Sequence, residues 1–176
     1  MTELTAERAR ELFYYDPETG LLLWKMGGKG IPAHKSLVAG HVNNGGYRYI
    51  RVAKRLYLAH RIVWLYMHGS WPEGDIDHIN GERADNRSRN LRSVSRSVNN
   101  ENRVVASADN KSTGLIGAHY HKYSGKFTSQ IVVREQKFYL GYFDTAEEAH
   151  DAYMTAKAEL HSGYIPRPRH ADDYPI

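Results

Sequence analysis

The sequence predicts an α+β protein of two small domains, and three observations support this. Alternating apolar and polar residues with turn signals between them indicate short antiparallel strands within residues 38–59 and again within 116–143. A helical pattern follows each strand region, at residues 60–68 and after Thr145. A stretch of small and polar residues at 105–113 separates the two regions, and 176 residues suit two modest domains.

The N-terminal part is expected to begin with a helix. Thr5 can cap a helix that runs to residue 14, and Asp16-Pro17 stops it ahead of a strand at residues 21–25. The glycine-rich loop at 27–30 lacks the spacing and the hydroxyl residue of a nucleotide-binding P-loop. Three strands and a helix are expected next, at residues 38–42, 47–52, 56–59 and 60–68.

The strand at 47–52 alternates in a way that puts Tyr49 and Arg51 on one face. A basic, tyrosine-bearing face suits a DNA groove, and it is equally an ordinary exposed strand surface, so both interpretations stay open. In the helix that follows, His60 and Arg61 are expected to be structural or to position phosphate rather than to take part in chemistry.

Charge is distributed unevenly along the chain. Between Arg83 and Arg103 there are six arginines and two acids, an excess equal to the formal charge of +4 of the whole protein. From Asp144 onward there are seven acids and three bases. Clustered positive charge favours an anionic partner such as nucleic acid, and the acidic end is expected to lie away from it.

Two classes of protein are excluded by composition. The chain has no cysteine, which rules out disulfides and cysteine-based zinc sites. No apolar run approaches the ~20 residues that span a bilayer, and the N-terminus lacks an apolar secretion core. We therefore expect no membrane partner and a soluble, cytoplasmic protein.

The stretch with the clearest chemistry starts at Asp77-His78-Ile79-Asn80-Gly81 and continues through Asp85-Asn86-Arg87, Asn90-Leu91-Arg92 and Asn99. We expect a strand, a long loop, a second strand and a helix here, at residues 76–79, 80–90, 91–94 and 95–103.

Phosphodiester hydrolysis needs an activated water and a stabilised leaving oxygen. His78 suits the first task because imidazole titrates near neutral pH. Asp77 and Asn99 offer oxygen ligands for a hard cation such as Mg²⁺. Adjacent strand residues point to opposite sides, so that Asp77 and His78 can straddle a phosphate. Taken singly, these residues also fit a turn with a hydrogen-bonded histidine and asparagine caps.

The spacing resembles the HNH, or ββα-metal, nuclease motif in its variant that ends in asparagine. From His78 the intervals are 12 residues to Asn90 and 21 to Asn99. The resemblance implies that His78 is the general base, that Asp77 and Asn99 bind a divalent metal, Mg²⁺ or alternatively Mn²⁺, and that Asn90 completes the catalytic set by bracing the histidine's loop. Residues 56–65 resemble the segment ahead of this motif in phage and intron-encoded homing endonucleases. The arginines expected near phosphate are Arg61, Arg87 and Arg92.

Beyond residue 113 we expect three strands and one helix, at residues 116–121, 127–133, 138–143 and from the capping box Thr145–Glu148 to Gly163. This part resembles the Apetala-type, ethylene-response-factor DNA-binding domain through Gly117, Gly125-Lys126-Phe127, Leu140-Gly141-Tyr142-Phe143-Asp144 and Ala152-Tyr153. In that family a three-stranded sheet enters the major groove and the helix packs behind it. The matching DNA-contacting positions are Gly117, His119, His121, Gln130, Lys137 and Tyr139.

The contact face departs from that family, because His119, His121 and Val132 stand where it carries arginines. Phosphate pairing and guanine reading are weaker as a result, whereas Gln130 can read adenine and Lys137 can pair with phosphate. The two histidines have alternatives as plain surface residues or as a metal site.

Together these expectations describe an HNH endonuclease of the homing type from a phage or mobile element, acting on double-stranded DNA inside the host cell. The expected product has 5′-phosphate and 3′-hydroxyl ends, with nicking as the default because one motif is present. The expected state is a monomer, with a dimer left open. The alternatives are a non-catalytic, sequence-specific DNA-binding regulator with a vestigial nuclease centre, and a structure-selective or RNA-directed nuclease. The expected limits are residues 1–104 (nuclease), 105–113 (linker), 114–165 (DNA-binding module) and 166–176 (tail).

Overall fold

The computed structural model describes residues 3–25, 38–107 and 109–166. The glycine-rich loop at 27–30 and the tail after residue 166 lie outside these ranges. The chain divides into two compact units, Met1–Arg96 and Ser97–Ile176. This division falls earlier than the linker expected at residues 105–113, and the domain limits stay a prediction.

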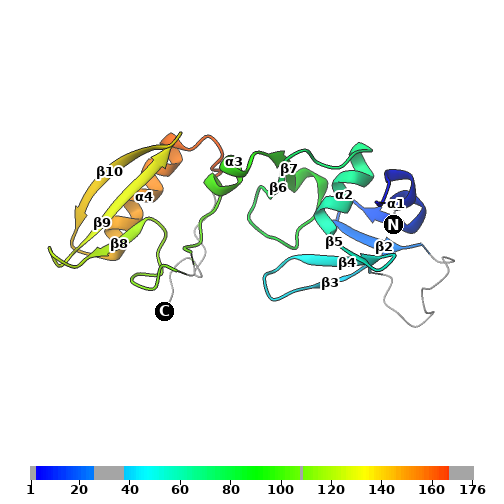
Figure 1. Cartoon of the computed structure of the whole chain (residues 1–176), viewed down its shortest axis with the longest axis horizontal. Coiled ribbons are helices and arrows are strands. Elements are labelled where there is room, and N and C mark those ends of the chain that lie inside the picture. Colours follow the sequence, from blue (N-terminus) through cyan, green and yellow to red (C-terminus); the bar gives the residue numbers. More distant parts are fainter. Residues whose placement is uncertain (1–2, 26–37, 108, 167–176) are drawn as a thin grey trace. The chain divides into compact units, whose positions relative to one another are not determined.

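The first unit is built from small antiparallel sheets and two helices (Figure 1). In chain order its elements are α1 (Ala6–Leu12), β1 (Phe13–Asp16), β2 (Leu21–Trp24), β3 (His41–Val42), β4 (Arg48–Val52), β5 (Arg55–Leu58), α2 (Ala59–His68), β6 (Asp75–His78), η1 (Ser88–Asn90) and β7 (Leu91–Val94). The sheets are β1-β2, β3-β4-β5 and β6-β7. One apolar core joins them, and its fully buried side chains include Phe13, Leu22, Ile50, Ile62 and Leu65.

The start of the chain differs from the prediction of a helix to residue 14. Thr5 does cap α1, accepting a hydrogen bond from the Arg8 amide at 3.2 Å, but the helix ends at Leu12. Phe13 and Tyr15 are buried and the residue between them is exposed, an alternation that suits a strand. Residues 13–16 therefore pair with β2 as a hairpin.

The strand expected at 38–42 is also shorter than predicted. Regular pairing is limited to His41 and Val42, and Val38 forms only an isolated bridge to Leu23 of β2. The hairpin of β4 and β5 is confirmed, with Leu58 opposite Tyr49.

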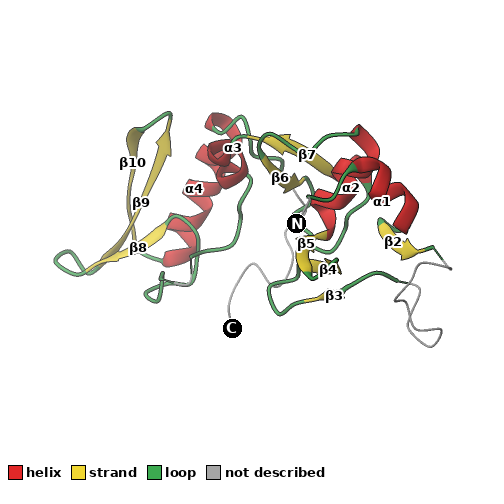
Figure 2. Cartoon of the chain, turned by 45° about the vertical axis from the view of Figure 1, so that its right-hand side comes forward, coloured by secondary structure: helices red, strands yellow, loops and turns green. Residues whose placement is uncertain are grey.

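The second unit contains most of α3 (Arg96–Glu101), followed by β8 (Ala118–His121), β9 (Lys126–Val133), β10 (Gln136–Phe143) and α4 (Ala146–Leu160). The sheet has the order β10-β9-β8, and α4 packs along it (Figure 2). The predicted capping box is present, since Thr145 and Glu148 each accept a hydrogen bond from the other's amide. The α+β class and the sheet packed on one helix are thus confirmed.

The end of α4 is a further correction. The helix stops at Leu160 with His161 as its cap, two residues before the expected Gly163. Gly163 instead lies against α3, where an added Cβ would be 2.5 Å from the Val98 carbonyl oxygen. None of the helices in the described parts of the chain combines the length and apolar character needed to cross a membrane.

Candidate active site

Strands β6 and β7 place the two central residues of the predicted site. The strands pair antiparallel, with Asp77 opposite Arg92 and His78 opposite Leu91. Asp77 and His78 are both buried, at 6% and 5% exposure. Their partners differ, as expected for neighbours that point to opposite sides of a strand. The two side chains therefore have separate environments.

His78 is held by three side chains from three different segments. Its Nε2 lies 3.0 Å from Oδ1 of Asn86, in the loop after β6. The centroid of its ring lies 5.0 Å from that of His60 of α2, with the rings edge-on, and 6.2 Å from that of Tyr47. An amide oxygen can only accept, so the tautomer of neutral His78 that donates Nε2–H to it has its lone pair on Nδ1.

Burial also sets the charge state of this histidine pair. It lowers the pKa of His78, although the Asn86 hydrogen bond and the Asp77 and Asp85 carboxylates oppose the shift. Burial lowers the pKa of His60 to about 3, and the nearby His78 and Arg61 add to the effect. Both rings are therefore neutral near pH 7, which is the form a general base requires.

Asp77 forms an ion pair on its side of the strand. Arg92 reaches its Oδ2 through Nε and Nη2, each at 2.8 Å. Arg92 was predicted to lie near phosphate, and here the guanidinium neutralises the carboxylate predicted to bind metal. An entering cation would therefore compete with Arg92 for this oxygen.

Asn90 ties together the two ends of the loop at 79–90. Its Oδ1 accepts from the Asn80 amide at 2.9 Å, and its Nδ2 donates to the Asp85 carbonyl at 2.8 Å. Its own carbonyl accepts from the Ile79 amide. Both amide atoms of this buried side chain serve the loop. These contacts are compatible with a bracing role for Asn90, which stays a prediction.

The hairpin β1-β2 supports the same loop from outside. The Tyr15 hydroxyl donates to the Asn86 carbonyl at 3.1 Å and accepts from the Ser88 amide at 2.7 Å. Gly20 lies so close that a Cβ would be 2.4 Å from the Arg87 nitrogen. Its φ of +72° also favours glycine. The conformation of Asn86, and through it of His78, thus depends on β1 and on the turn at Gly20.

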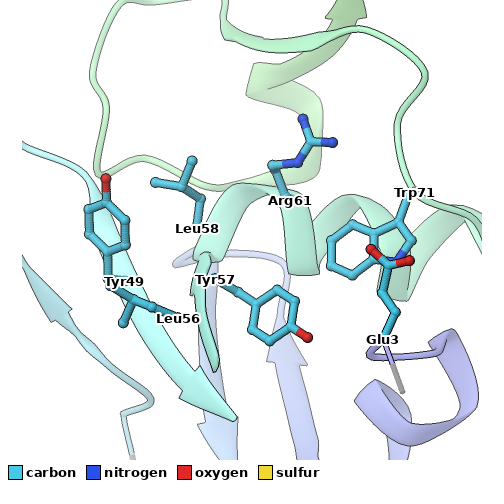
Figure 3. Close-up of a pocket in the computed structure, with 7 residues that line it drawn as sticks. All are labelled: Glu3, Tyr49, Leu56, Tyr57, Leu58, Arg61 and Trp71. Carbon is cyan, nitrogen blue, oxygen red and sulfur yellow. The ribbon is translucent and has the colours of Figure 1, made fainter. Parts of the chain in front are cut away.

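Two of the arginines expected near phosphate are engaged inside the first unit. Arg87 pairs with Asp85 through Nε at 2.7 Å and through Nη2, and this pairing lowers the pKa of Asp85 to about 2. Arg61 donates to the Gly74 carbonyl at 3.4 Å. Arg61 lines a cavity of about 330 Å³. Figure 3 shows its side chain on α2, between Leu58 and Trp71. Contact of these arginines with DNA stays a prediction.

Asn99, the second predicted metal ligand, lies on α3 and belongs to the second unit. In the described part of the chain, no three His, Cys, Asp or Glu side chains gather as a metal cluster. The predicted donors are one carboxylate and one amide oxygen, a set that suits a hard cation which keeps several waters. The chemistry of the residues fits Mg²⁺, and their joint binding of it stays a prediction.

The outer face of the second unit carries most of the residues expected to touch DNA. Three side-chain rings on this face lie next to one another. The ring centroid of Tyr142 is 5.7 Å from that of Tyr139 and 5.3 Å from that of His121. Gln130 pairs with Tyr139 across the sheet, and the remaining two expected residues on the strands are His119 and Lys137. All of these lie at positions with some exposure.

Gly117 has a different surrounding. Its φ is +79°, and a Cβ there would lie 2.0 Å from the Tyr153 ring of α4. The absence of a side chain therefore lets the chain pass close to the helix. Its predicted contact with DNA stays a prediction.

Sequence reasoning missed three residues of the site: Asn86 and Tyr47, which lie against His78, and Tyr15, which contacts Asn86. Asn86 had a signal, since it stands in the Asp85-Asn86-Arg87 stretch, but its hydrogen bond to the histidine requires the folded loop. Its Nδ2 is buried and has no hydrogen-bond partner among the described residues, a state that costs free energy. Tyr47 and Tyr15 gave no local signal, because each meets the site only through long-range packing.

Comparison with known proteins adds to this geometry. Residues 57–101 match the model of the HNH endonuclease family. No curated protein and no solved structure matches the chain. The matched segment includes α2, both strands of the site and α3, and with them Asp77, His78, Asn90 and Asn99. It supports a DNA nuclease of the HNH class, a hydrolase that generally uses a divalent metal.

Proposed function

We propose that the chain is a metal-dependent DNA endonuclease of the homing type, which nicks double-stranded DNA and leaves 5′-phosphate and 3′-hydroxyl ends. The observation that carries this proposal is the state of His78. It is neutral, it is held through Nε2 by Asn86, and it neighbours Asp77 on a strand inside the matched HNH segment. Nicking is the default because the chain carries one copy of the motif.

In this proposal His78 takes the proton of the attacking water on Nδ1, while Asn86 keeps the ring from rotating. Asp77 and Asn99 would hold a divalent cation, with Mg²⁺ first and Mn²⁺ as the alternative. When bound, such a cation stabilises the charge on the phosphate and on the leaving 3′ oxygen. Arg92, which pairs with Asp77 in this structure, would then be available to the phosphate. Arg61 and Arg87 are the further candidates for phosphate contacts.

The second unit is proposed to act as an Apetala-type DNA-binding module. Support comes from its three-stranded sheet packed on one helix and from the exposed polar and aromatic face of that sheet. His119, His121, Gln130, Lys137 and Tyr139 are proposed to touch the duplex.

The test is conversion of supercoiled plasmid to open circle in Mg²⁺, with wild type, His78→Ala and His68→Ala compared. His68 is an exposed histidine of α2 and serves as the matched control. Loss of a general base is expected to slow nicking by about 10²–10⁴-fold. The nicks should be sealed by DNA ligase without prior phosphorylation, since ligase needs a 5′-phosphate.

Equal nicking by wild type and His78→Ala would refute the mechanism. Binding of plasmid by wild type without any cleavage would favour the rival function, a DNA-binding regulator whose centre is vestigial.

A further inference from the structure

Helix α3, which carries Asn99, is too short to be stable alone. It has six residues and none of them is fully buried. Isolated helices shorter than about 12–15 residues are marginal in water. The conformation of this helix therefore depends on the residues that contact it.

Within the second unit, residues at the end of α4 and in the turn after it contact residues 98–103, and we call these contacts the grip. The amide of Gly163 donates to the Glu101 Oε2 at 2.8 Å, and the Ile165 amide donates to Oδ1 of buried Asn102 at 3.3 Å. The close approach of Gly163 to Val98 leaves no room for a side chain there.

A buried lysine completes this grip. Lys157 is 1% exposed, and its Nζ donates to the Arg103 carbonyl at 2.5 Å. The same Nζ lies 5.3 Å from the centroids of the Tyr153 and Tyr164 rings. A lysine is rarely buried this deeply without such partners, so the contact fixes the segment just after α3 firmly.

We propose that Glu101, Gly163 and Lys157 are positioning residues for Asn99, the predicted metal ligand, because they hold the helix that carries it. This inference rests on the proposed function and gives the C-terminal unit a second role besides binding DNA. Without the grip, residues 98–103 would have to become ordered each time a metal binds. That ordering cost weakens metal binding.

The test compares full-length Glu101→Ala and Glu101→Gln. Glutamine keeps an oxygen that accepts from the Gly163 amide, whereas alanine removes it. Glu159→Ala, an exposed glutamate of α4, is the matched control. Mn²⁺ binding is followed by electron paramagnetic resonance, and exchange of the Asn102 amide with deuterium reports the order of the helix without metal.

Glu101→Ala is expected to raise the Mn²⁺ concentration for half-occupancy about threefold to tenfold, the effect of losing one hydrogen bond. Exchange of the Asn102 amide should quicken by a similar factor. Glu101→Gln and Glu159→Ala should stay within about twofold of wild type.

Three results would overturn the inference. If Glu101→Ala binds Mn²⁺ and exchanges as wild type does, the grip has no role. If Glu101→Gln is as weak as Glu101→Ala, the carboxylate charge acts instead of the hydrogen bond. If wild type itself binds no Mn²⁺, the proposed function is wrong, and the grip positions no metal ligand.

Discussion

Around His78 the polar side chains of the first unit are buried or partly buried and paired with one another, whereas on the sheet of the second unit they are partly or fully exposed. Arg87 and Arg92 each contact an aspartate, and Asn86 contacts the histidine. On the sheet, by contrast, Tyr139 is 57% and Tyr142 50% exposed. Two arginines of the cluster that dominates the sequence are thus held in ion pairs at the site. The others, Arg83, Arg89, Arg96 and Arg103, are exposed, and the open face of the second unit's sheet carries mainly rings. Density of charge in a sequence does not by itself locate the binding surface.

Among the substitutions that test this contrast, Asn86→Ala is expected to have the largest effect, and the quantity affected is kcat. Replacement by alanine removes the acceptor for His78 Nε2, so that the ring no longer has a fixed direction. We expect kcat to fall about 10–100-fold, a part of the loss that follows removal of the base itself. DNA affinity should change less than about twofold. Single-turnover nicking and a binding titration measure the two quantities.

Asn44→Ala is the matched control, since this asparagine is exposed in the turn before β4. A fall in DNA affinity for Asn86→Ala with unchanged kcat would contradict the division between a buried centre and an exposed binding face. Thermal melting shows whether the variant is folded.

Sequence alone predicts much of this centre. The intervals from His78 to Asn90 and Asn99 can be read directly from the sequence, and the strand predicted at residues 91–94 has the bounds of β7. What the sequence cannot give is which side chains meet across long separations. Tyr15 and Asn86 are 71 positions apart, and Arg83 and its acceptor Gly45 are 38 apart.

The wrong elements have the same physical origin. Residues 13–14 fit a helix locally, but burial of Phe13 and Tyr15 beside β2 favours a strand. Gly163 was expected to end α4, but the helix ends at Leu160. Gly163 instead packs closely against the Val98 backbone. Tertiary packing overrides local preference at both sites.

Burial of the histidines can be tested through the dependence of the free energy of unfolding on pH. The folded state keeps His60 neutral down to a pKa of about 3, whereas the unfolded chain binds that proton near pH 6.5. Below pH 6.5 the unfolded state therefore binds more protons, and stability falls as pH falls. Between pH 6.5 and 5 this one group should remove on the order of 2 kcal/mol from the free energy of unfolding.

His60→Gln should lose that part of the acid sensitivity, and His68→Gln should not. The residual sensitivity belongs in part to His78, whose pKa is also lowered by burial. Denaturant unfolding at several pH values measures the difference. Parallel pH curves for wild type and His60→Gln would show that His60 is accessible to water in the folded protein.

The smallest effects are expected from substitutions on the exposed face of the second unit's sheet. Tyr142→Ala removes a ring that contacts both Tyr139 and His121, and Lys137→Ala removes a charge from the same face. Stability should stay within about 0.5 kcal/mol for both. If this face binds DNA, Tyr142→Ala should weaken binding about fivefold at every salt concentration, because no charge is lost. Lys137→Ala should instead reduce the slope of log affinity against log salt by about one.

Tyr14→Ala is the control for the tyrosine, since that residue is 54% exposed on β1 of the first unit. Affinity is measured on uncut duplex with Ca²⁺ in place of Mg²⁺, so that cleavage does not distort the titration. Equal affinities and slopes for all three variants and wild type would place the DNA-contacting surface elsewhere, and exposed arginines of the first unit such as Arg83 and Arg89 would then be the next candidates. That result would reverse the contrast between the two regions.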